Sequence, residues 1–264
     1  MGTTAHNRHK DWDKVDSICL IAKAAAELNA EHGRKLFTVS QGVFQQPNAE
    51  LQQIEIERAF TAARYANATY PGTVDSIIFT NEYFEDNFKG FQVFFMIYEN
   101  RDRARQLGLK VGTRTHKYHH ILSPNSDSYG ALSCIVKISD IIMCNLYPDP
   151  TFAHSSVDVA IHEVTGLYEL LRNAFKKLNH KIDVVIGESG WPSHGHVLDG
   201  TPLTVSHLVN YWRKLGDWAS YKRVSVYFFE AFDQPWRGEM NSYESHFGWW
   251  FDHGERFIEK SNPN

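Results

Sequence analysis

Short runs of apolar residues alternate along this chain with longer segments in which apolar residues recur every three or four positions. The short runs predict β-strands at residues 36–44, 76–83, 110–115, 140–147, 183–188 and 223–231. The longer segments predict amphipathic helices at residues 15–30, 51–66, 91–107, 157–178 and 205–216, followed by one more helix after Trp250. Most of the short runs are almost continuously apolar, which is typical of parallel strands with helices on both faces of the sheet.

Strands and helices in alternation predict an α/β fold, and a chain of 264 residues has the size of either a (β/α)₈ TIM barrel or a doubly wound sheet. Periodicity does not choose between the two. Polar residues at the ends of the apolar runs favour the barrel, because the chemistry of a barrel collects at the carboxyl ends of its strands. These ends read Thr80-Asn81-Glu82, Asn145-Leu146-Tyr147, Gly187-Glu188-Ser189 and Glu230-Ala231-Phe232. We therefore expect a single catalytic barrel domain over residues 1–264.

The beginning of the chain does not fit a complete barrel. Such a barrel needs about two more strands before Val15, where the chain is mostly polar. The opening residues Met-Gly-Thr-Thr-Ala-His are interpreted as the tail of a second strand. The first strand and its helix would then be absent, replaced or supplied by another segment. The expected fold is a TIM barrel whose first strand-helix unit is missing or atypical.

Charge and composition restrict the class of ligand. The formal net charge is −4 and the isoelectric point is near 6.4, so no basic field would attract a phosphate backbone. A neutral substrate therefore fits better than nucleic acid. Aromatic residues make up 14% of the chain, and they serve equally well as platforms for sugar rings and as core side chains. No apolar run reaches the roughly 18 residues of a membrane span, no nucleotide-binding glycine motif occurs and the cysteines show no CxxC spacing. We expect no membrane segment, no metal, no cofactor and a monomer.

Two glutamates, Glu82 and Glu188, stand at the ends of apolar runs. Alternation along a strand places Glu82 on the same face as Thr80 and Ile78. A buried and unpaired carboxylate is costly, which makes both glutamates functional candidates. A retaining glycosidase needs two carboxyl groups about 5 to 5.5 Å apart, one as nucleophile and one as acid/base. Spacing alone leaves equally open the alternative that each glutamate only pairs with a cation.

The residues around these glutamates resemble one family of glycosidases. Glu188 stands in Gly-Glu-Ser-Gly-Trp-Pro-Ser (187–193), which is similar to the nucleophile signature of glycoside hydrolase family 17, the β-1,3-glucanase and β-1,3-glucanosyltransferase family, in its fungal or microbial form. Thr80-Asn81-Glu82 resembles the Asn-Glu pair that ends the fourth strand in the larger clan of retaining glycosidases. Residues 229–236 and 244–250 are similar to the last-strand and closing motifs of the family. The resemblance runs from about residue 15 to residue 257.

This resemblance implies that Glu188 is the nucleophile and that Glu82 is the acid/base. Asn81 would contact the sugar 2-hydroxyl group, and Asn145 and Tyr147 would orient the nucleophile or line the subsite of the distorted sugar. Further substrate contacts are expected from Tyr83, Trp191, Glu230, Asp233 and Glu244. An aromatic acceptor subsite is a further hypothesis, because several aromatic residues follow the strand ends. These residues are Tyr83, Phe84, Phe152, Trp249 and Trp250. At least one of the tryptophans Trp191, Trp249 and Trp250 is expected in the core.

The chain also departs from the family pattern. The Gly-Val-x-Tyr-Gly strand that opens the family's barrel is not found. Plant members carry a lysine near the last-strand acids, whereas the nearest cation in this sequence is Arg237. The planar guanidinium of arginine is not interchangeable with the compact charge of lysine, so the resemblance assigns no role to Arg237.

The activity implied by the resemblance is retaining cleavage of β-1,3-glucan or laminari-oligosaccharides. The covalent glycosyl-enzyme intermediate passes to water in hydrolysis and to a sugar hydroxyl group in transfer, and the sequence does not separate these outcomes. Two alternatives stay open: a related clan glycosidase acting on another β-glucan, xylan or mannan, and a catalytically silent glucan-binding barrel. The family also implies an extracellular or cell-wall location, although no signal peptide is visible in the sequence.

Overall fold

The computed structural model describes residues 2–3, 20–148, 156–195, 203–237, 242–252 and 257–261. Contacts within the chain define two compact units. The first unit comprises Met1–Met143 and Asn173–Val184, and the second comprises Cys144–Arg172 and Val185–Asn264. Strands β1 to β7 follow one another in the sheet in the order of the sequence, and the pairs from β1 to β4 and the pair β6–β7 are parallel. The predicted alternation of parallel strands with helices is therefore confirmed.

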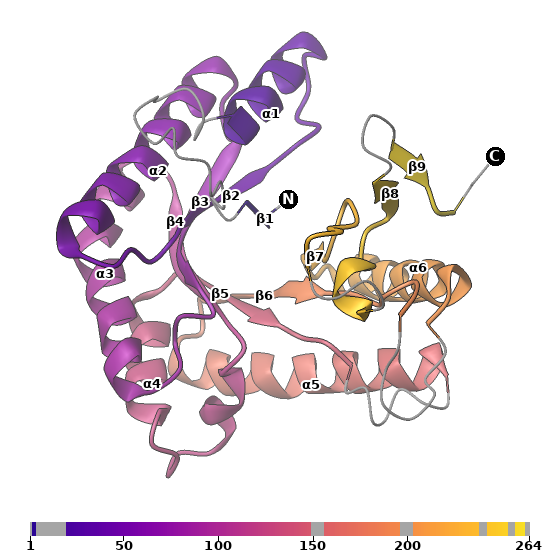
Figure 1. The fold of residues 1–264 in the computed structure, drawn as a ribbon. Helices are drawn as coiled ribbons and strands as arrows, with labels where there is room; N and C mark the ends of the chain where they lie inside the picture. Colours follow the sequence, from indigo (N-terminus) through magenta and orange to yellow (C-terminus); the bar gives the residue numbers. More distant parts are fainter. Residues whose placement is uncertain are drawn as a thin grey trace. The chain divides into compact units, whose positions relative to one another are not determined.

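The first unit consists of strands with helices packed beside them (Figure 1). Its strands are β1 (Gly2–Thr3), β2 (Val39–Val43), β3 (Val74–Asn81) and β4 (Lys110–Thr115). Its helices are α1 (Leu20–Glu31), α2 (Ala49–Thr69), α3 (Asn87–Gln106) and α4 (Tyr129–Ile138), with a short 3₁₀ helix η2 at Tyr118–Leu122. Two strands begin in this unit and end in the second, namely β5 (Ile141–Asn145) and β6 (Asp183–Ser189).

The second unit contains shorter strands. Helix α5 (Val157–Leu178) begins in it, and α6 (Val205–Lys222) lies wholly within it. Strand β7 (Val226–Phe228) is followed by the 3₁₀ helix η3 (Tyr243–Ser245) and by the antiparallel pair β8 (Trp250–Asp252) and β9 (Phe257–Glu259).

Helices α1 to α3 form the core of the first unit with strands β2 to β4. Fully buried side chains include Phe60 of α2, Ile97 of α3 and Phe79 of β3. Each such side chain stabilises the fold by about 1.5–3 kcal/mol relative to its exposure to water. Asn48 and Asp86 fix where α2 and α3 begin, because their side chains accept hydrogen bonds from backbone N–H groups of the first helical turns.

The predicted boundaries of strand 110–115 and helix 157–178 agree with β4 and α5. Helix 205–216 is longer than predicted and continues to Lys222, since Gly216 is an ordinary helical residue and not a helix end. A glycine inside a helix costs only about 1 kcal/mol relative to alanine, so it does not stop the helix. Arg223 ends α6 in the left-handed conformation with φ 57°, and the predicted strand 223–231 is consequently shortened to β7.

Two elements differ from the sequence prediction, and one at the beginning of the chain agrees with it. Helix α4 was not predicted, although its buried Ala131, Leu132, Ile135 and Val136 have helical spacing. The helix predicted after Trp250 is wrong for the residues that the structure describes there, which form β8 and β9. The expected tail of a second strand at the beginning of the chain corresponds to β1, which pairs with β2. The predicted helix start at residues 15–19 lies outside the described residues.

Candidate active site

The carboxyl end of β3 carries two residues in an unusual backbone conformation. Thr80 and Glu82, on either side of Asn81, have φ angles of 66° and 56°. Side chains other than glycine rarely adopt this left-handed region, and such residues cluster at functional sites. The pairing with β4 also shifts between Ile78 and Asn81. Regular alternation is therefore interrupted before Glu82, and the shared face of Glu82, Thr80 and Ile78 stays a prediction.

Glu82 lies immediately after β3 in a polar surrounding. Its backbone N–H donates to the carbonyl of Arg114 at 3.1 Å, which ties it to β4. Its side chain is 41% exposed, and its Oε1 lies 3.8 Å from Nδ1 of His116. His116 also lies 3.8 Å from a carboxylate oxygen of Glu85, which forms an ion pair with Lys117 at 3.4 Å. The candidate acid/base thus stands among other ionisable side chains.

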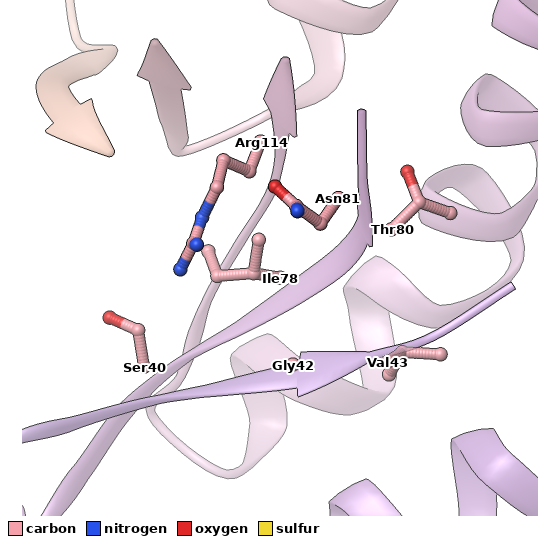
Figure 2. A pocket seen from close by; sticks show the side chains of 7 residues that line it. All are labelled: Ser40, Gly42, Val43, Ile78, Thr80, Asn81 and Arg114. Carbon is pink, nitrogen blue, oxygen red and sulfur yellow. The ribbon is translucent and has the colours of Figure 1, made fainter. Parts of the chain in front are cut away.

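A small pocket adjoins Asn81 at the ends of β2, β3 and β4. Its lining comprises Ser40, Gly42, Val43, Ile78, Thr80, Asn81 and Arg114. Figure 2 shows the side chains of Asn81 and Arg114 extending to the same side of the strands, whereas Thr80 extends to the other. Arg114 is buried although it carries a charge. Hydroxyl, amide and guanidinium groups together suit the hydroxyl groups of a sugar.

Glu188 lies near the end of β6 in the second unit. The hydroxyl group of Tyr147 donates a hydrogen bond of 3.0 Å to its Oε2. The Glu188 carbonyl accepts from the N–H of Leu146 at 2.8 Å, which fixes the backbone beside β5. A hydrogen bond to a carboxylate stabilises its ionised form. The hydrogen bond from Tyr147 therefore orients the Glu188 carboxyl group.

Aromatic rings hold Tyr147 in place. Its ring packs edge-on against Phe229, with centroids 6.3 Å apart, and against Phe247, with centroids 5.9 Å apart. Edge-to-face packing restricts the rotation of a ring. The direction of the Tyr147 hydroxyl group toward Glu188 is consequently fixed by its neighbours.

Glu230 is a carboxyl group whose pKa is strongly perturbed. Its pKa is raised to about 7, chiefly by burial and also by the nearby charges of Asp233 and Glu188, while Arg237 and the Gln234 amide act in the opposite direction. Its Oε2 accepts a hydrogen bond from Gln234, and its Oε1 is buried without a protein partner. Glu230 therefore holds a proton close to neutral pH beside the charge of Glu188.

Asp233, three residues after Glu230, is buried beside a lysine that sequence reasoning missed. The Lys260 ammonium donates to Asp233 Oδ1 at 2.7 Å, and Lys260 has no exposed side-chain surface. Among the described residues, the cation paired with Asp233 is thus Lys260, and not Arg237, which is nearest in sequence. Arg237 acts electrostatically on Glu230 instead. Lys260 follows Phe257-Ile258-Glu259 in the sequence, and no local pattern there indicates that this lysine is buried.

The tryptophans divide as expected into core and partly exposed rings. Trp191 is only 2% exposed and stacks on His207, so its ring packs in the core, and its contact with substrate stays a prediction. Trp249 stacks on Trp212 and donates to Glu259, and Trp250 packs against Phe232. Both remain partly exposed.

The other predicted substrate residues are distributed over both units. Tyr83 is partly buried and donates to Gln92, whereas Phe84 is fully buried and is not available to an acceptor. Asn145 is buried at the end of β5, and Glu244 lies partly buried in η3. Phe152 lies outside the described residues. Within the second unit, the structure brings together the predicted residues Tyr147, Glu188, Glu230 and Asp233, and within the first it brings together Asn81, Glu82 and Tyr83.

Membrane-spanning helices and metal sites are both absent from the described part of the chain. No helix there is long and apolar enough to cross a bilayer. No group of histidine, cysteine, aspartate or glutamate side chains in the same residues is arranged to hold a metal ion.

Known structures share this fold. An endo-laminarinase from Formosa matches with a TM-score of 0.70 and 18% identity, over 88% of this chain and 70% of that chain. A glycoside hydrolase family 17 β-1,3-glucanosyltransferase from Rhizomucor miehei matches with a TM-score of 0.63 and 21% identity, over 89% of this chain and 79% of that chain. At these identities the likeness shows the fold alone, and it confirms the predicted (β/α) barrel class.

Two sequence comparisons give the family. A glucan 1,3-beta-glucosidase from Schizosaccharomyces pombe is 26% identical over 121 residues, which are 45% of this chain and 37% of that protein. The match therefore spans little more than a third of this relative. The family model for the BtgE/BtgC glycoside hydrolase domain matches residues 15–248, most of the chain. The predicted kinship with β-1,3-glucan glycosidases is confirmed at this level, and the chain belongs to the BtgE/BtgC glycoside hydrolase domain family.

Proposed function

We propose that this chain cleaves β-1,3-glucan with retention of configuration, through a glycosyl-enzyme intermediate on Glu188. The observation that carries the proposal is the hydrogen bond of 3.0 Å from Tyr147 to Glu188 at the carboxyl end of β6. Catalytic side chains of this fold class stand at the carboxyl ends of strands. A nucleophilic carboxylate must stay ionised, and a hydrogen bond from a fixed hydroxyl group favours that state.

Glu188 attacks the anomeric carbon in the first step, and the bond between that carbon and the glycosidic oxygen breaks. The departing oxygen takes a proton, for which Glu82 is the proposed donor. In the second step Glu82 removes a proton from water or from a sugar hydroxyl group, whose oxygen then displaces Glu188. The mechanism requires the two carboxyl groups to reach opposite faces of the same sugar.

Several of the remaining predicted residues have supporting roles in this proposal. Asn81 lines the pocket at the end of β3 and is proposed to bind sugar hydroxyl groups, together with Arg114, which the sequence did not predict. Asn145 is proposed to line the subsite of the reacting sugar. Glu230, Asp233 and Glu244 follow β7 and are proposed to bind sugar or to support Glu188.

The proposed substrate follows from the family and from the structural neighbours. One neighbour was solved as an active-site mutant of the Rhizomucor miehei β-1,3-glucanosyltransferase in complex with laminaritriose, at a TM-score of 0.62. The named neighbours act by hydrolysis in one case and by transfer in another, so both outcomes belong to the proposal for this chain. Such a substrate implies action at a glucan-containing cell wall, outside the cell.

The test is product analysis on reduced laminari-oligosaccharides. Products shorter than the substrate establish cleavage, longer products establish transfer, and the anomeric configuration of the first product, read by proton NMR, establishes retention. Glu188→Gln is the inactive reference, because it keeps the shape of the side chain and removes the nucleophile. Turnover that survives unchanged in Glu188→Gln, or a wild-type enzyme that prefers mannan or xylan, contradicts the proposal.

A further inference from the structure

Lys260, directly after β9, is a fully buried lysine beyond the residues that the family model matches. Its ammonium group donates to Asp233 Oδ1 at 2.7 Å, to Ser193 Oγ at 2.7 Å and to the His246 carbonyl at 3.3 Å. A lysine ammonium has three N–H donors, so these acceptors account for all of them. Lys260 is therefore a satisfied buried cation with a specific set of partners.

The acceptors belong to three segments of the second unit. Ser193 ends the segment that follows Glu188, and Asp233 lies in the segment that contains Glu230. His246 precedes residues 247–250, which pair with the Glu230 segment through backbone hydrogen bonds. Ser193 N also donates to the His246 carbonyl at 2.9 Å. One side chain thus connects the loops after β6 and β7 with the closing segment.

These segments pack with no free space between their backbones. A Cβ atom added to Gly190 would lie 2.2 Å from the Phe229 carbonyl oxygen. A Cβ atom added to Gly248 would lie 2.1 Å from the Asp233 backbone nitrogen, and Gly248 N donates to Asp233 Oδ1 at 2.9 Å. Close-packed segments transmit displacement, because they have no voids in which to absorb it. A shift at Asp233 is therefore expected to reach Glu230 and the Glu188 loop.

We propose that Lys260 is a positioning residue for the nucleophile side of the active site, holding the Glu188 and Glu230 loops in register through Asp233, Ser193 and the His246 carbonyl. This inference rests on the proposed function of Glu188. It adds a residue outside the matched domain to the machinery. Lys260 does not touch the reacting atoms in this proposal.

The charges around Lys260 explain why a cation stands there. Asp233 is buried, and a buried carboxylate without a partner is expensive. Burial lowers the pKa of Lys260, whereas the charges of Asp233 and Glu230 raise it. His246 lies 3.8 Å from the other oxygen of Asp233, and the Phe251 ring lies 4.8 Å from the ammonium group.

The same charges act on Glu230. Asp233 and Glu188 raise its pKa, Arg237 and Gln234 lower it, and its interaction with the Lys260 ammonium also favours the ionised carboxylate. Removal of the Lys260 charge is therefore expected to raise the pKa of Glu230. Removal of the Lys260 and Asp233 charges together is expected to leave it near its original value, because the two effects oppose each other.

The experiment compares Lys260→Met, the double variant Lys260→Met/Asp233→Asn and Lys214→Met. Lys214 forms an exposed ion pair with Asp158 in the same unit and is the matched control. In Lys260→Met we expect kcat to fall by about tenfold to a hundredfold, because misplaced catalytic groups slow the chemical step, while KM changes less than about threefold. The double variant is expected to recover part of the lost kcat, since the asparagine side chain in place of Asp233 keeps an acceptor for the N–H group of Gly248. The control keeps the wild-type kcat.

A second measurement follows the Glu230 carboxyl by carbon NMR against pH and needs no turnover. Its pKa is expected to rise by about one unit in Lys260→Met and to return toward the wild-type value in the double variant. A residue that only stabilises the fold would change the unfolding temperature without this pattern. A Lys260→Met enzyme with wild-type kcat and an unmoved Glu230 titration overturns the proposal.

Folding and function are separated by two checks. If Lys260→Met does not fold, the double variant Lys260→Met/Asp233→Asn is used in its place. A folded double variant with a lowered kcat supports the positioning role of Lys260, and one with full kcat shows that Lys260 only stabilises the structure. The wild-type enzyme and Glu188→Gln are assayed first on laminari-oligosaccharides. Failure of that comparison refutes the proposed function, whereas its success followed by an unaffected Lys260 variant refutes only the role of Lys260.

Discussion

The two units of the molecule each contain a buried polar side chain that connects loops, and the two side chains differ in charge and in position. In the first unit this residue is Asn29 of α1, which is neutral and fully buried. In the second unit it is the charged Lys260. Asn29 binds the segments that lead into strands, and Lys260 binds the segments that leave them.

Asn29 uses both ends of its amide. Its Oδ1 accepts from the N–H groups of Leu36 and Phe37 at 2.7 and 2.9 Å, and its Nδ2 donates to the Phe37 carbonyl and to Thr73 Oγ1 at 2.9 and 3.0 Å. Leu36 and Phe37 precede β2, and Thr73 precedes β3. Asn29 therefore acts at the amino ends of strands, where features of a barrel serve stability.

Lys260 acts at the opposite kind of strand end. Ser193 and Asp233 follow β6 and β7 at their carboxyl ends, where the chemistry of a barrel is found. A buried ion pair stabilises less than a well-packed apolar pair of the same volume. The neutral Asn29 thus stands at strand ends that serve only stability, whereas the charged Lys260 stands at strand ends where the proposed chemistry depends on charge.

The largest effect is expected from Glu188→Ala, which removes the proposed nucleophile. We expect kcat on laminari-oligosaccharides to fall by about 10⁴-fold or more, since nucleophile variants lose most of the catalytic advantage. The free energy of unfolding is expected to stay close to the wild-type value, because Glu188 is partly exposed. Kinetics and urea unfolding on the same preparations measure the two quantities. Glu169→Ala, at a partly exposed position of α5 whose side chain pairs with Lys222, is the control.

Azide rescue with an aryl β-glucoside substrate separates the roles of the two glutamates. In Glu188→Ala azide attacks the substrate itself and yields an α-glycosyl azide. In Glu82→Ala azide attacks the glycosyl-enzyme and yields the β-anomer, after a loss of about 10²- to 10⁴-fold on substrates that need protonation. The opposite pair of anomers would exchange the assignments of Glu82 and Glu188.

Asn29→Ala is expected to have the second largest effect, on stability and not on activity. It removes a fully buried side chain and leaves the N–H groups of Leu36 and Phe37 without their acceptor, so the free energy of unfolding should fall by about 2–4 kcal/mol. The kcat of the folded enzyme, measured well below its unfolding temperature, should remain unchanged. Lys110→Met, which removes the exposed pair with Asp183, is expected to cost at most about 1 kcal/mol. A large loss of kcat in Asn29→Ala would contradict the assignment of stability to the amino ends of the strands and of catalysis to their carboxyl ends.

Sequence reasoning succeeded where a local pattern decides the structure. Strand 110–115 and helix 157–178 were correct because each carries its own apolar periodicity. Helix α4 was missed because a short segment rich in isoleucine and valine reads equally as a strand. The predicted end of helix 205–216 at Gly216 was wrong, because the helical conformation of this glycine is decided by packing and not by its propensity.

Candidate residues were found from sequence where a motif surrounds them. Glu82 and Glu188 stand in such motifs, whereas the pairing of Lys260 with Asp233 joins residues 27 positions apart in the sequence. No periodicity reports such a pairing, since it depends on which loops the fold brings together. The burial of Trp191 and the left-handed backbone of Thr80 and Glu82 are likewise consequences of tertiary packing.

Tyr147→Phe tests whether the hydrogen bond from Tyr147 to Glu188, at the carboxyl end of β6, contributes to catalysis. A hydrogen bond to a charged group contributes about 1.5–3 kcal/mol, so we expect kcat to fall by about tenfold to a hundredfold. The phenylalanine ring keeps the edge-on packing with Phe229 and Phe247, and stability should change little. Tyr221→Phe, at a strongly exposed position of α6, is the matched control. An unchanged kcat in Tyr147→Phe would remove the main support for an oriented nucleophile.

The smallest expected effect is the dependence of stability on pH that Glu230 introduces. Its pKa is raised from 4.5 to about 7 in the folded protein, so between these pH values the folded state binds more protons than the unfolded chain. The contribution of Glu230 to stability is therefore present at low pH and is lost as pH rises through 7, by about 1–3 kcal/mol after allowance for its partial exposure. In Glu230→Gln, urea unfolding at pH 5 and pH 7.5 should show that this decrease has disappeared.

Glu57→Gln in the first unit is the control of opposite sign. Its pKa is lowered, chiefly by the hydrogen bond from Arg103, so its stabilising contribution is present above the ordinary pKa near 4.5 and is lost only toward more acidic pH. Between pH 5 and pH 7.5 the slope of stability should then be the same in Glu57→Gln as in the wild type. If Glu230→Gln also keeps the wild-type slope, Glu230 carries no proton near neutrality. The carboxyl end of β7 would then differ from the first unit only in its contacts and not in its protonation.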